Sequence, residues 1–501
     1  NKSVLYVGAQ YLFRSTNRGD SWQKLSPDLT TNNPEKQKQE ESGGLTIDNS
    51  TAENHCTIYA ISESPKDSKI IWAGTDDGNL QVTNDDGKSW NDVTSNIPGL
   101  PENTWCSKVA ASNYDINTAY IVFDGHRNGD KNVYVYKTID LGETWTSLET
   151  ESIEGFARTI VEDFVNPNLL FLGTEYGLYV TLDGGSQWVR FEGNTPKVPI
   201  YEMVIHPTEN DLVMGTHGRG VLILDDITPL RSFTNEVIES DVTIFPTEPY
   251  TITNPQFAYG ISGDHEFRGR NPSSSAIITY YLKKRHVFGD MSVEIYNSDG
   301  ELVKTLPAGK KKGINRVRWI VMKKPPKVKA SSPLLAFRTA AGPTFPPGEY
   351  TVKIKKGDKE YEGKIILQTD PKAGHSEEDM KLQFETLNHA YNLLEDVSFA
   401  DKQVTDLKNK LDDASKNVEN IEFKNELFAL SEHLEKMHKE LVATSPHRIA
   451  GQIRLAEKIA DIYSGIISYS GKPTDSQIER LSLLEGEFNQ YRTEVDIIFN
   501  D

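Results

Sequence analysis

Short hydrophobic stretches alternate with polar turns along the first 230 residues of the chain. Segments such as "LYVGAQ", "IWAGTDDG" and "LFLGTEYG" contain a few apolar residues followed by a glycine and polar residues. Runs of this length, bounded by turn residues, predict short β-strands rather than helices. We therefore expect this region to form small antiparallel sheets joined by tight turns.

One turn sequence occurs four times in this region. The copies are "STNRGDSW" (15–22), "TNDDGKSW" (83–90), "TIDLGETW" (138–145) and "TLDGGSQW" (181–188). In the shared pattern Ser/Thr-x-Asp-x-Gly-x-x-Trp, the aspartate is expected to accept backbone N–H bonds and the glycine to take a positive φ. The tryptophan would close the hairpin by packing on it. A fifth unit, "LVMGTHGRGVLILDD", keeps the strand and the glycine without the tryptophan. Such repeats predict a β-propeller or an array.

The four copies resemble the Asp-box (BNR) repeat of sialidases, two-propeller xyloglucan-active glycosidases and sortilin-type receptors. In those families the box lies at the blade periphery, which implies a structural role here. The residues concerned are Asn17, Gly19, Trp22, Asp85, Gly87, Trp90, Asp140, Gly142, Trp145, Asp183, Gly185 and Trp188. No metal is expected in these loops, because they lack the alternating oxygen ligands and the distal glutamate of an EF-hand.

More broadly, residues 1–230 resemble large BNR-repeat proteins of Bacteroidetes-type bacteria, which are sortilin-like or glycosyl hydrolase-like. This resemblance implies a secreted, periplasmic or outer-membrane-associated protein. The units found are one partial, three full and one closing unit, and the chain starts inside a blade. We therefore expect an incomplete ring, whose missing blades belong to an N-terminal part of a longer protein.

The remaining sequence changes character twice. Residues 231–254, rich in Thr and Pro, are predicted to be a linker. Residues 255–370 contain alternating strands and the turn "NSDG", and "PPGEYTVKI" resembles the closing strands of Ig-like sandwiches, so an Ig-like β-sandwich is expected. Residues 371–501 place apolar residues three or four apart, which predicts a helical bundle with breaks near 417–420, 445–446 and 471–473. The predicted fold class is therefore mainly β with an α tail.

Charge is distributed unevenly along the chain, whose formal net charge is −19. Residues 1–254 carry 18 basic against 37 acidic side chains, whereas residues 255–370 carry 21 against 11. An acidic chain is a poor candidate for nucleic-acid binding, because phosphate contacts require clustered cations. The sequence also contains no apolar run near the ~18–20 residues that cross a bilayer.

Candidate ligand-binding residues are sought where innermost propeller strands begin, because those ends converge on the central channel. The residues proposed there and in nearby loops are His55, Trp105, His126, Arg127, Tyr201, His217 and Arg219. A glycoside hydrolase would need two opposed carboxylates ~5–10 Å apart. The acidic candidates are Glu53, Glu63, Asp124 and Glu202, and the sequence does not show which of them face each other.

The two cysteines allow three interpretations. Cys56 and Cys106 are expected to be buried as small apolar residues, with a disulfide between neighbouring blades as one alternative. A Cys56–His55 nucleophile pair is disfavoured, because adjacent strand residues point to opposite faces.

Two functions remain open at this point. The first is a binding or scaffold protein that presents its channel face to a peptide, protein or glycan. The second is a xyloglucanase-like glycoside hydrolase whose cleft is only partly encoded in this chain. No cofactor and no metal site is predicted for either function.

Overall fold

The computed structural model describes residues 4–38, 55–252, 275–329, 331–444 and 452–500 of the chain. Strands are the main regular elements described as far as residue 369, and long helices follow from residue 377. Two compact units divide the chain, Asn1–Ile238 and Glu239–Asp501.

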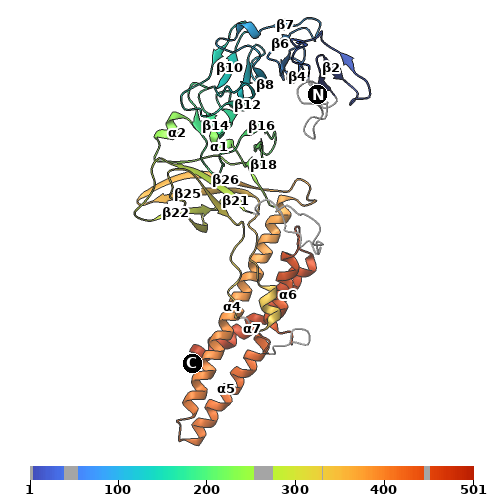
Figure 1. Cartoon of the computed structure of the whole chain (residues 1–501). Helices are drawn as coiled ribbons and strands as arrows, with labels where there is room; N and C mark the ends of the chain where they lie inside the picture. Colours follow the sequence, from blue (N-terminus) through green and yellow to red (C-terminus); the bar gives the residue numbers. More distant parts are fainter. Residues whose placement is uncertain (1–3, 39–54, 253–274, 330, 445–451, 501) are drawn as a thin grey trace. The chain divides into compact units, whose positions relative to one another are not determined.

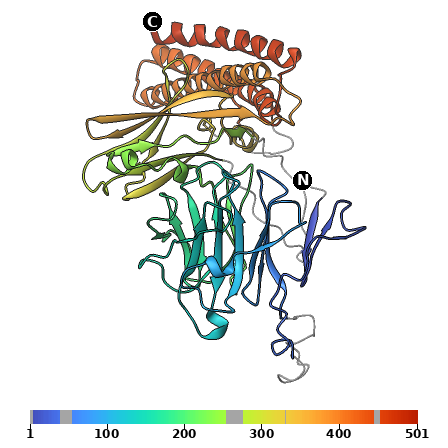
Figure 2. The same cartoon turned by 90° about the horizontal axis from the view of Figure 1, so that it is seen from above.

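Along residues 4–38 and 55–238 of the first unit, five antiparallel sheets follow one another (Figures 1 and 2). Every sheet is a meander in which strands pair in chain order, and the first strands β4, β8, β12 and β16 pack successively against one another. This is a propeller-like arrangement of small sheets. The strands are β1 (Leu5–Gly8), β2 (Leu12–Ser15), β3 (Gln23–Lys24); β4 (Ile58–Glu63), β5 (Ile71–Thr75), β6 (Leu80–Thr83), β7 (Asn91–Asp92); β8 (Trp105–Ala111), β9 (Ala119–Asp124), β10 (Tyr134–Thr138), β11 (Thr146–Ser147); β12 (Ala157–Glu162), β13 (Leu170–Thr174), β14 (Gly177–Thr181), β15 (Val189–Arg190); and β16 (Ile200–Ile205), β17 (Leu212–Thr216), β18 (Val221–Leu224).

Glycines at or near the ends of strands β1, β5 and β13 allow neighbouring sheets to approach closely. An added Cβ atom would lie 2.7 Å from Ile58 Cβ at Gly8, 2.3 Å from Cys106 Sγ at Gly74, and 2.9 Å from Ile200 Cγ2 at Gly173. These three partners all lie near the start of the next sheet's first strand. The glycine that ends each hydrophobic stretch in the sequence is therefore required by packing between sheets.

The repeated turn closes on itself through local hydrogen bonds. In the third copy, the Thr138 hydroxyl donates to Asp140 Oδ1 at 2.8 Å and accepts from Gly142 N at 2.9 Å. Asp140 Oδ1 also accepts from Thr144 N at 2.9 Å, while Gly142 has a φ of 90°. The other three copies make the same three bonds. The aspartate, or Asn17 in the first copy, is thus engaged by its own turn.

Replacing Asp140 by alanine is expected to lower the free energy of unfolding of the first unit by about 1–2 kcal/mol at pH 7, because Thr144 loses its acceptor. Hydrogen bonds from Thr144 hold the pKa of Asp140 below its ordinary value. Its ionised form therefore stabilises the fold above about pH 4, and this contribution is lost as the pH falls further. Urea unfolding at several pH values, followed by tryptophan fluorescence, measures both effects.

Asp140→Asn is the matched control for this prediction, because Asn17 forms the same turn with an amide oxygen. This variant should keep most of its stability at pH 7 and lose less than the wild type below about pH 4, since it cannot be protonated there. An asparagine variant as unstable as the alanine variant at pH 7 would contradict this account of the turn.

The second unit begins with two sheets that share one hydrophobic core. The strand order is β19-β21-β24 in one sheet and β20-β26-β25-β22-β23 in the other, and buried side chains such as Tyr280, Trp319 and Val352 form one cluster between them. Two of the strands, β19 and β20, come from the segment 231–254 that the sequence predicts to be a linker. The strands are β19 (Val242–Ile244), β20 (Tyr250–Ile252), β21 (Ala276–Leu282), β22 (Met291–Tyr296), β23 (Leu302–Pro307), β24 (Gly313–Trp319), β25 (Gly348–Lys356) and β26 (Lys359–Thr369). The short helix α1 (Thr228–Arg231) and nearly all of α2 (Asn235–Glu239) precede them at the end of the first unit.

In the described part of the C-terminal region there are four helices: α4 (Glu377–Ser415), α5 (Ile421–Leu441), α6 (Leu455–Ile467) and α7 (Asp475–Asn500). The predicted breaks at 417–420 and 471–473 fall between helices, whereas 445–446 lies outside the described residues. Before α7, Thr474 N donates to Gln477 Oε1 at 2.9 Å and Gln477 N to Thr474 Oγ1 at 3.3 Å, which is the geometry of a capping box. No helix in the described part of the chain is both long and apolar enough to cross a membrane.

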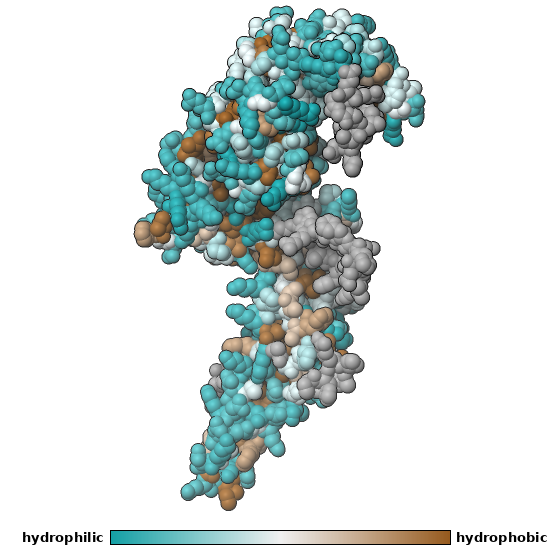
Figure 3. Space-filling model, viewed as in Figure 1, coloured by the Kyte–Doolittle hydropathy of each residue, from teal (hydrophilic) through white to brown (hydrophobic). Residues whose placement is uncertain are grey.

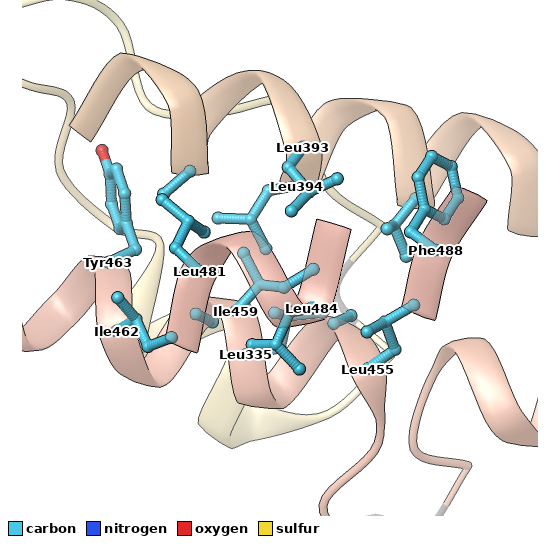
Figure 4. Close-up of a cluster of buried hydrophobic side chains, with 14 of the residues drawn as sticks. Leu335, Leu393, Leu394, Leu455, Ile459, Ile462, Tyr463, Leu481, Leu484 and Phe488 are labelled. Carbon is cyan, nitrogen blue, oxygen red and sulfur yellow. The ribbon is translucent and has the colours of Figure 1, made fainter. Parts of the chain in front are cut away.

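Side chains from all four of these helices meet in one core, to which α5 contributes Leu441 at its end. Figure 4 shows residues of α4, α6 and α7 gathered with Leu335 of the short helix α3 (Pro333–Arg338). Phe384 of α4 instead packs beside the core of the two sheets, where its ring centroid lies 5.8 Å from that of Phe345. On the face that Figure 3 shows, hydrophilic residues predominate over α4 and α5, as expected for helices that bury one apolar face.

Candidate ligand-binding site

The first strands of four consecutive sheets share one irregularity. In β4, β8, β12 and β16 the pairing with the second strand skips one residue, which forms a β-bulge. The skipped residues are Tyr59, Ser107, Arg158 and Tyr201. Bulges redirect side chains and are frequent beside functional sites. Because these strands pack in succession, the bulges bring four positions, distant in sequence, to the same end of neighbouring sheets.

A buried ion pair lies among these bulges. Arg158 Nη1 donates to Asp124 Oδ2 at 2.8 Å, and both side chains are buried. The other oxygen, Asp124 Oδ1, accepts from His126 N at 2.9 Å and lies 2.7 Å from His126 Nδ1. The His126 ring is stacked on Phe156 with centroids 4.6 Å apart. Both oxygens of Asp124 are therefore engaged, and its charge is compensated by Arg158.

Trp105 lies at the centre of a group of aromatic and cationic side chains. The ring of Tyr59 meets it edge-on with centroids 4.5 Å apart. The guanidinium carbons of Arg127 and Arg158 lie 4.2 Å and 4.6 Å from the Trp105 ring centroid. Such cation–π contacts are strongest over tryptophan. Four elements of three different sheets thus contribute to one surface around Trp105.

Arg158 links this surface to the last sheet. Its guanidinium lies 3.9 Å from the ring centroid of Tyr201, which is stacked on His217 at 5.1 Å. Tyr59, Arg127, Tyr201 and His217 are exposed, whereas Trp105 and Arg158 are buried beneath them. These six residues are called the Trp105 cluster below. Its exposed members are open to a ligand and its buried members hold them in position.

A second ion pair adjoins the Trp105 cluster. Lys108 follows the bulge of β8, Glu202 follows the bulge of β16, and their side chains form an ion pair that passes over the intervening strand β12. Charges on this surface are therefore largely paired. Within the described residues, Arg127 has no carboxylate partner, so its cation remains available.

Comparisons with known proteins give little beyond the general fold. No protein-family model and no curated protein matches the sequence. The solved structures similar to this chain include YCF48 from Cyanidioschyzon merolae (19% identity, 33% of this chain, 52% of that one, TM-score 0.27). The GH74 xyloglucanase from Xanthomonas campestris is 10% identical over 73% of this chain and 52% of its own length (TM-score 0.32). The extracellular domain of the putative hybrid two component system BT3049 from B. thetaiotaomicron is 11% identical over 74% and 43% (TM-score 0.31).

The chain spans only about half the length of these solved proteins. At such identities and TM-scores, none of them indicates a ligand, substrate or partner for this chain.

Most of the ligand-binding residues predicted from the sequence do lie near one another. Trp105, Arg127, Tyr201 and His217 belong to the Trp105 cluster, and His126 adjoins it through Asp124. The other two have no described contact with the cluster. His55 Nδ1 lies 3.5 Å from Asp76 Oδ2, and Arg219 is exposed in the turn between β17 and β18.

The carboxylates predicted as catalytic candidates are not brought together as a free pair. Glu63 lies at the far end of β4, where it accepts a hydrogen bond from Tyr6 at 2.5 Å. Asp124 and Glu202 are both held in ion pairs. Glu53 lies outside the described residues. Among the described residues, no three His, Cys, Asp or Glu side chains are grouped so that they could hold a metal ion.

Both cysteines are buried and free, so the alternative of a disulfide between blades is wrong for this structure. Burial raises the pKa of the Cys56 thiol, and the nearby Asp77 raises it further. A raised pKa disfavours the thiolate that a Cys56–His55 nucleophile pair would need.

Two residues of the Trp105 cluster, Tyr59 and Arg158, were not predicted from the sequence. A detectable signal for them exists. Each first strand is followed by a residue whose backbone N–H makes the last hydrogen bond to the segment leading into the second strand: Ser64, Ser112, Asp163 and His206. When the four sequences are aligned on these residues, Tyr59, Ser107, Arg158 and Tyr201 fall at the same aligned position. Arg158 is then an unusual charged residue within the buried strand "FARTIVE".

Proposed function

We propose that the sheets of the first unit form a binding module, which uses the Trp105 cluster to hold a peptide or protein segment. The ligand would carry a carboxylate next to an apolar or aromatic side chain. The observation that carries this proposal is the convergence of exposed Tyr59, Arg127 and Tyr201 on Trp105 and Arg158.

The chemistry of the surface fits such a ligand. Exposed tyrosine rings offer large contact areas with few rotatable bonds, which lowers the entropy lost on binding. Arg127 supplies an unpaired cation in a region that is otherwise acidic, and its planar guanidinium suits a carboxylate. Arg158 is neutralised by Asp124, so its role is to support the two aromatic rings beside it.

A glycoside hydrolase is less well supported. Hydrolysis needs one carboxylic acid and a second carboxylate across the scissile bond. Asp124 and Glu202 are each engaged with a cation, and Glu63 lies at the opposite end of its strand. Glycan binding without hydrolysis uses the same aromatic surface, and it is distinguished by the experiment below.

We also propose that further blades of a longer protein pack beside the last sheet. Val221 of β18 is 64% exposed, whereas Leu80 and Leu178 at the equivalent position of earlier sheets are 0% exposed. A Cβ atom added to Gly215 would have no other atom closer than 3.8 Å. At Gly74 and Gly173, by contrast, side chains of the next sheet already occupy the space where a Cβ atom would lie. The resemblance of the repeats to secreted BNR proteins supports a location outside the cytoplasm.

The binding proposal is tested with the whole chain against immobilised peptide and oligosaccharide libraries, followed by affinity measurements on the selected ligand. Arg127→Ala is expected to weaken binding at least about tenfold, because a charge-assisted hydrogen bond is lost. Tyr59→Ala and Tyr201→Ala should each weaken it by a similar factor through lost contact area. The matched controls, Lys66→Ala and Tyr114→Ala in the exposed turns that follow the far ends of β4 and β8, should change affinity less than about twofold.

Two results would overturn this proposal. Selection of oligosaccharides alone would replace the peptide ligand by a glycan, and release of reducing sugar from them would restore the hydrolase. Equal losses in the control variants would show that binding does not take place at the Trp105 cluster.

A further inference from the structure

One end of the two-sheet core in the second unit carries the most exposed aromatic side chain among the described residues. Phe288 is 88% exposed and its neighbour Val287 is 62% exposed. Both lie in the loop 283–290, "KKRHVFGD", between β21 and β22. An isolated exposed phenylalanine needs no explanation, but here it stands with a second apolar residue at the tip of a loop.

Cations surround this apolar tip. Lys284 and Arg285 precede it in the same loop, and the loop 308–312, "AGKKK", adds three lysines. The two loops are joined by hydrogen bonds from His286 N to Lys310 O at 3.0 Å and from Lys310 Nζ to Gly289 O at 3.2 Å. Five exposed cations, Lys284, Arg285, Lys310, Lys311 and Lys312, therefore lie around Val287 and Phe288. This set of residues, 284–288 with 310–312, is called the basic tip.

The basic tip is not neutralised by its neighbours. None of its five cations has an ion-pair partner in the described part of the chain, while Lys283 just before it is paired with Glu239. Asp290 is the one carboxylate in the two loops. The adjoining β25–β26 turn contributes Asp358 and Lys359, whose charges cancel. In a chain with a net charge of −19, such a concentration of positive charge is a local feature.

The loops are held in a defined shape. The buried Asn315 side chain donates to Lys311 O at 2.7 Å and to Gly313 O at 3.0 Å, and it accepts from Lys311 N at 3.2 Å. Tyr280 donates to Gly309 O at 2.6 Å. Backbone that is already fixed loses little entropy on binding, so the exposed side chains are presented in advance.

We propose that the basic tip docks on an anionic lipid bilayer, with Val287 and Phe288 entering the boundary between headgroups and acyl chains. Cations attract the negative surface of such a membrane, and apolar side chains with a cationic collar anchor a protein at its interface. A soluble polyanion would use the lysines alone and would leave Phe288 in water, so the position of Phe288 favours the bilayer. The anchoring is peripheral and adds to whatever the first unit binds.

The test is co-sedimentation of the whole chain with phosphatidylcholine vesicles, with and without about 30% phosphatidylglycerol. We expect binding only to the anionic vesicles, with an affinity that falls as salt is raised. Replacing Lys310, Lys311 and Lys312 together by glutamine should lower the partition coefficient at least about tenfold, and Phe288→Ser should lower it about tenfold. Free glycerophosphate at millimolar concentration should not compete, because it offers no apolar phase.

Matched controls keep this proposal falsifiable. Phe337→Ser removes another exposed phenylalanine, and glutamine at Lys381, Lys402 and Lys410 removes three exposed lysines of α4. Both controls should bind vesicles as the wild type does. The proposal is overturned if the chain does not bind anionic vesicles, or if the control variants lose binding equally. It is also overturned if Phe288→Ser binds unchanged, since the tip would then be a simple polyanion site.

Discussion

Replacing Arg158 by methionine is expected to destabilise the first unit by about 3–5 kcal/mol, because it leaves the buried carboxylate of Asp124 without its cation. Arg158 is also the residue on which Trp105 and Tyr201 rest. The same variant should therefore weaken ligand binding at least as much as Arg127→Ala. Six of the seven tryptophans lie in the first unit, so urea unfolding followed by their fluorescence reports on this unit.

Two companion variants separate the ion pair from other effects of the substitution. Arg127→Met replaces an exposed arginine that also lies over the Trp105 ring. It should lower the free energy of unfolding by less than about 1 kcal/mol. The double variant Arg158→Met with Asp124→Asn should lose less unfolding free energy than the two single variants lose together, because no unpaired charge remains buried. A loss below about 1 kcal/mol for Arg158→Met alone would show that Asp124 does not depend on this partner.

The parts of the structure that could be predicted from the sequence are those whose partners lie within a few residues. In the third repeated turn, the hydrogen bonds among Thr138, Asp140 and Thr144 lie within seven residues of the sequence. The shape of the turn is therefore determined by the motif itself. The capping box of Thr474 and Gln477 is equally local. The change from sheets to helices followed from hydrophobic periodicity, which is again a short-range property.

The candidate site depends on contacts that join distant parts of the chain. Lys108 pairs with Glu202, 94 residues away, and Arg158 pairs with Asp124 on another sheet. Whether a carboxylate is free or paired decides its chemistry, and residue type alone does not show this. Tyr59, whose ring contacts Trp105, is the bulged residue of its strand, and bulge positions depend on the register with the neighbouring strand.

Trp188→Ala is expected to destabilise the first unit by about 3–5 kcal/mol, the range for removing a buried aromatic side chain. Trp188 is 2% exposed, and its Nε1 donates to Leu148 O of the preceding sheet at 3.0 Å. Trp188 therefore lies in a buried cluster with Tyr179 of its own sheet and also joins this sheet to the preceding one. Fluorescence of the remaining tryptophans during urea unfolding measures the loss.

Trp22 is the matched control, because it occupies the same place in the first copy of the repeat. It is 43% exposed, since no described sheet precedes β1–β3 to cover it. Trp22→Ala should therefore cost less than about 1 kcal/mol in this chain. In a longer protein whose additional blades pack beside β1–β3, the same substitution should cost several times more, because the ring would be buried as Trp188 is. Equal costs for Trp22 and Trp188 in the present chain would contradict the assignment of Trp188 to the contact between sheets.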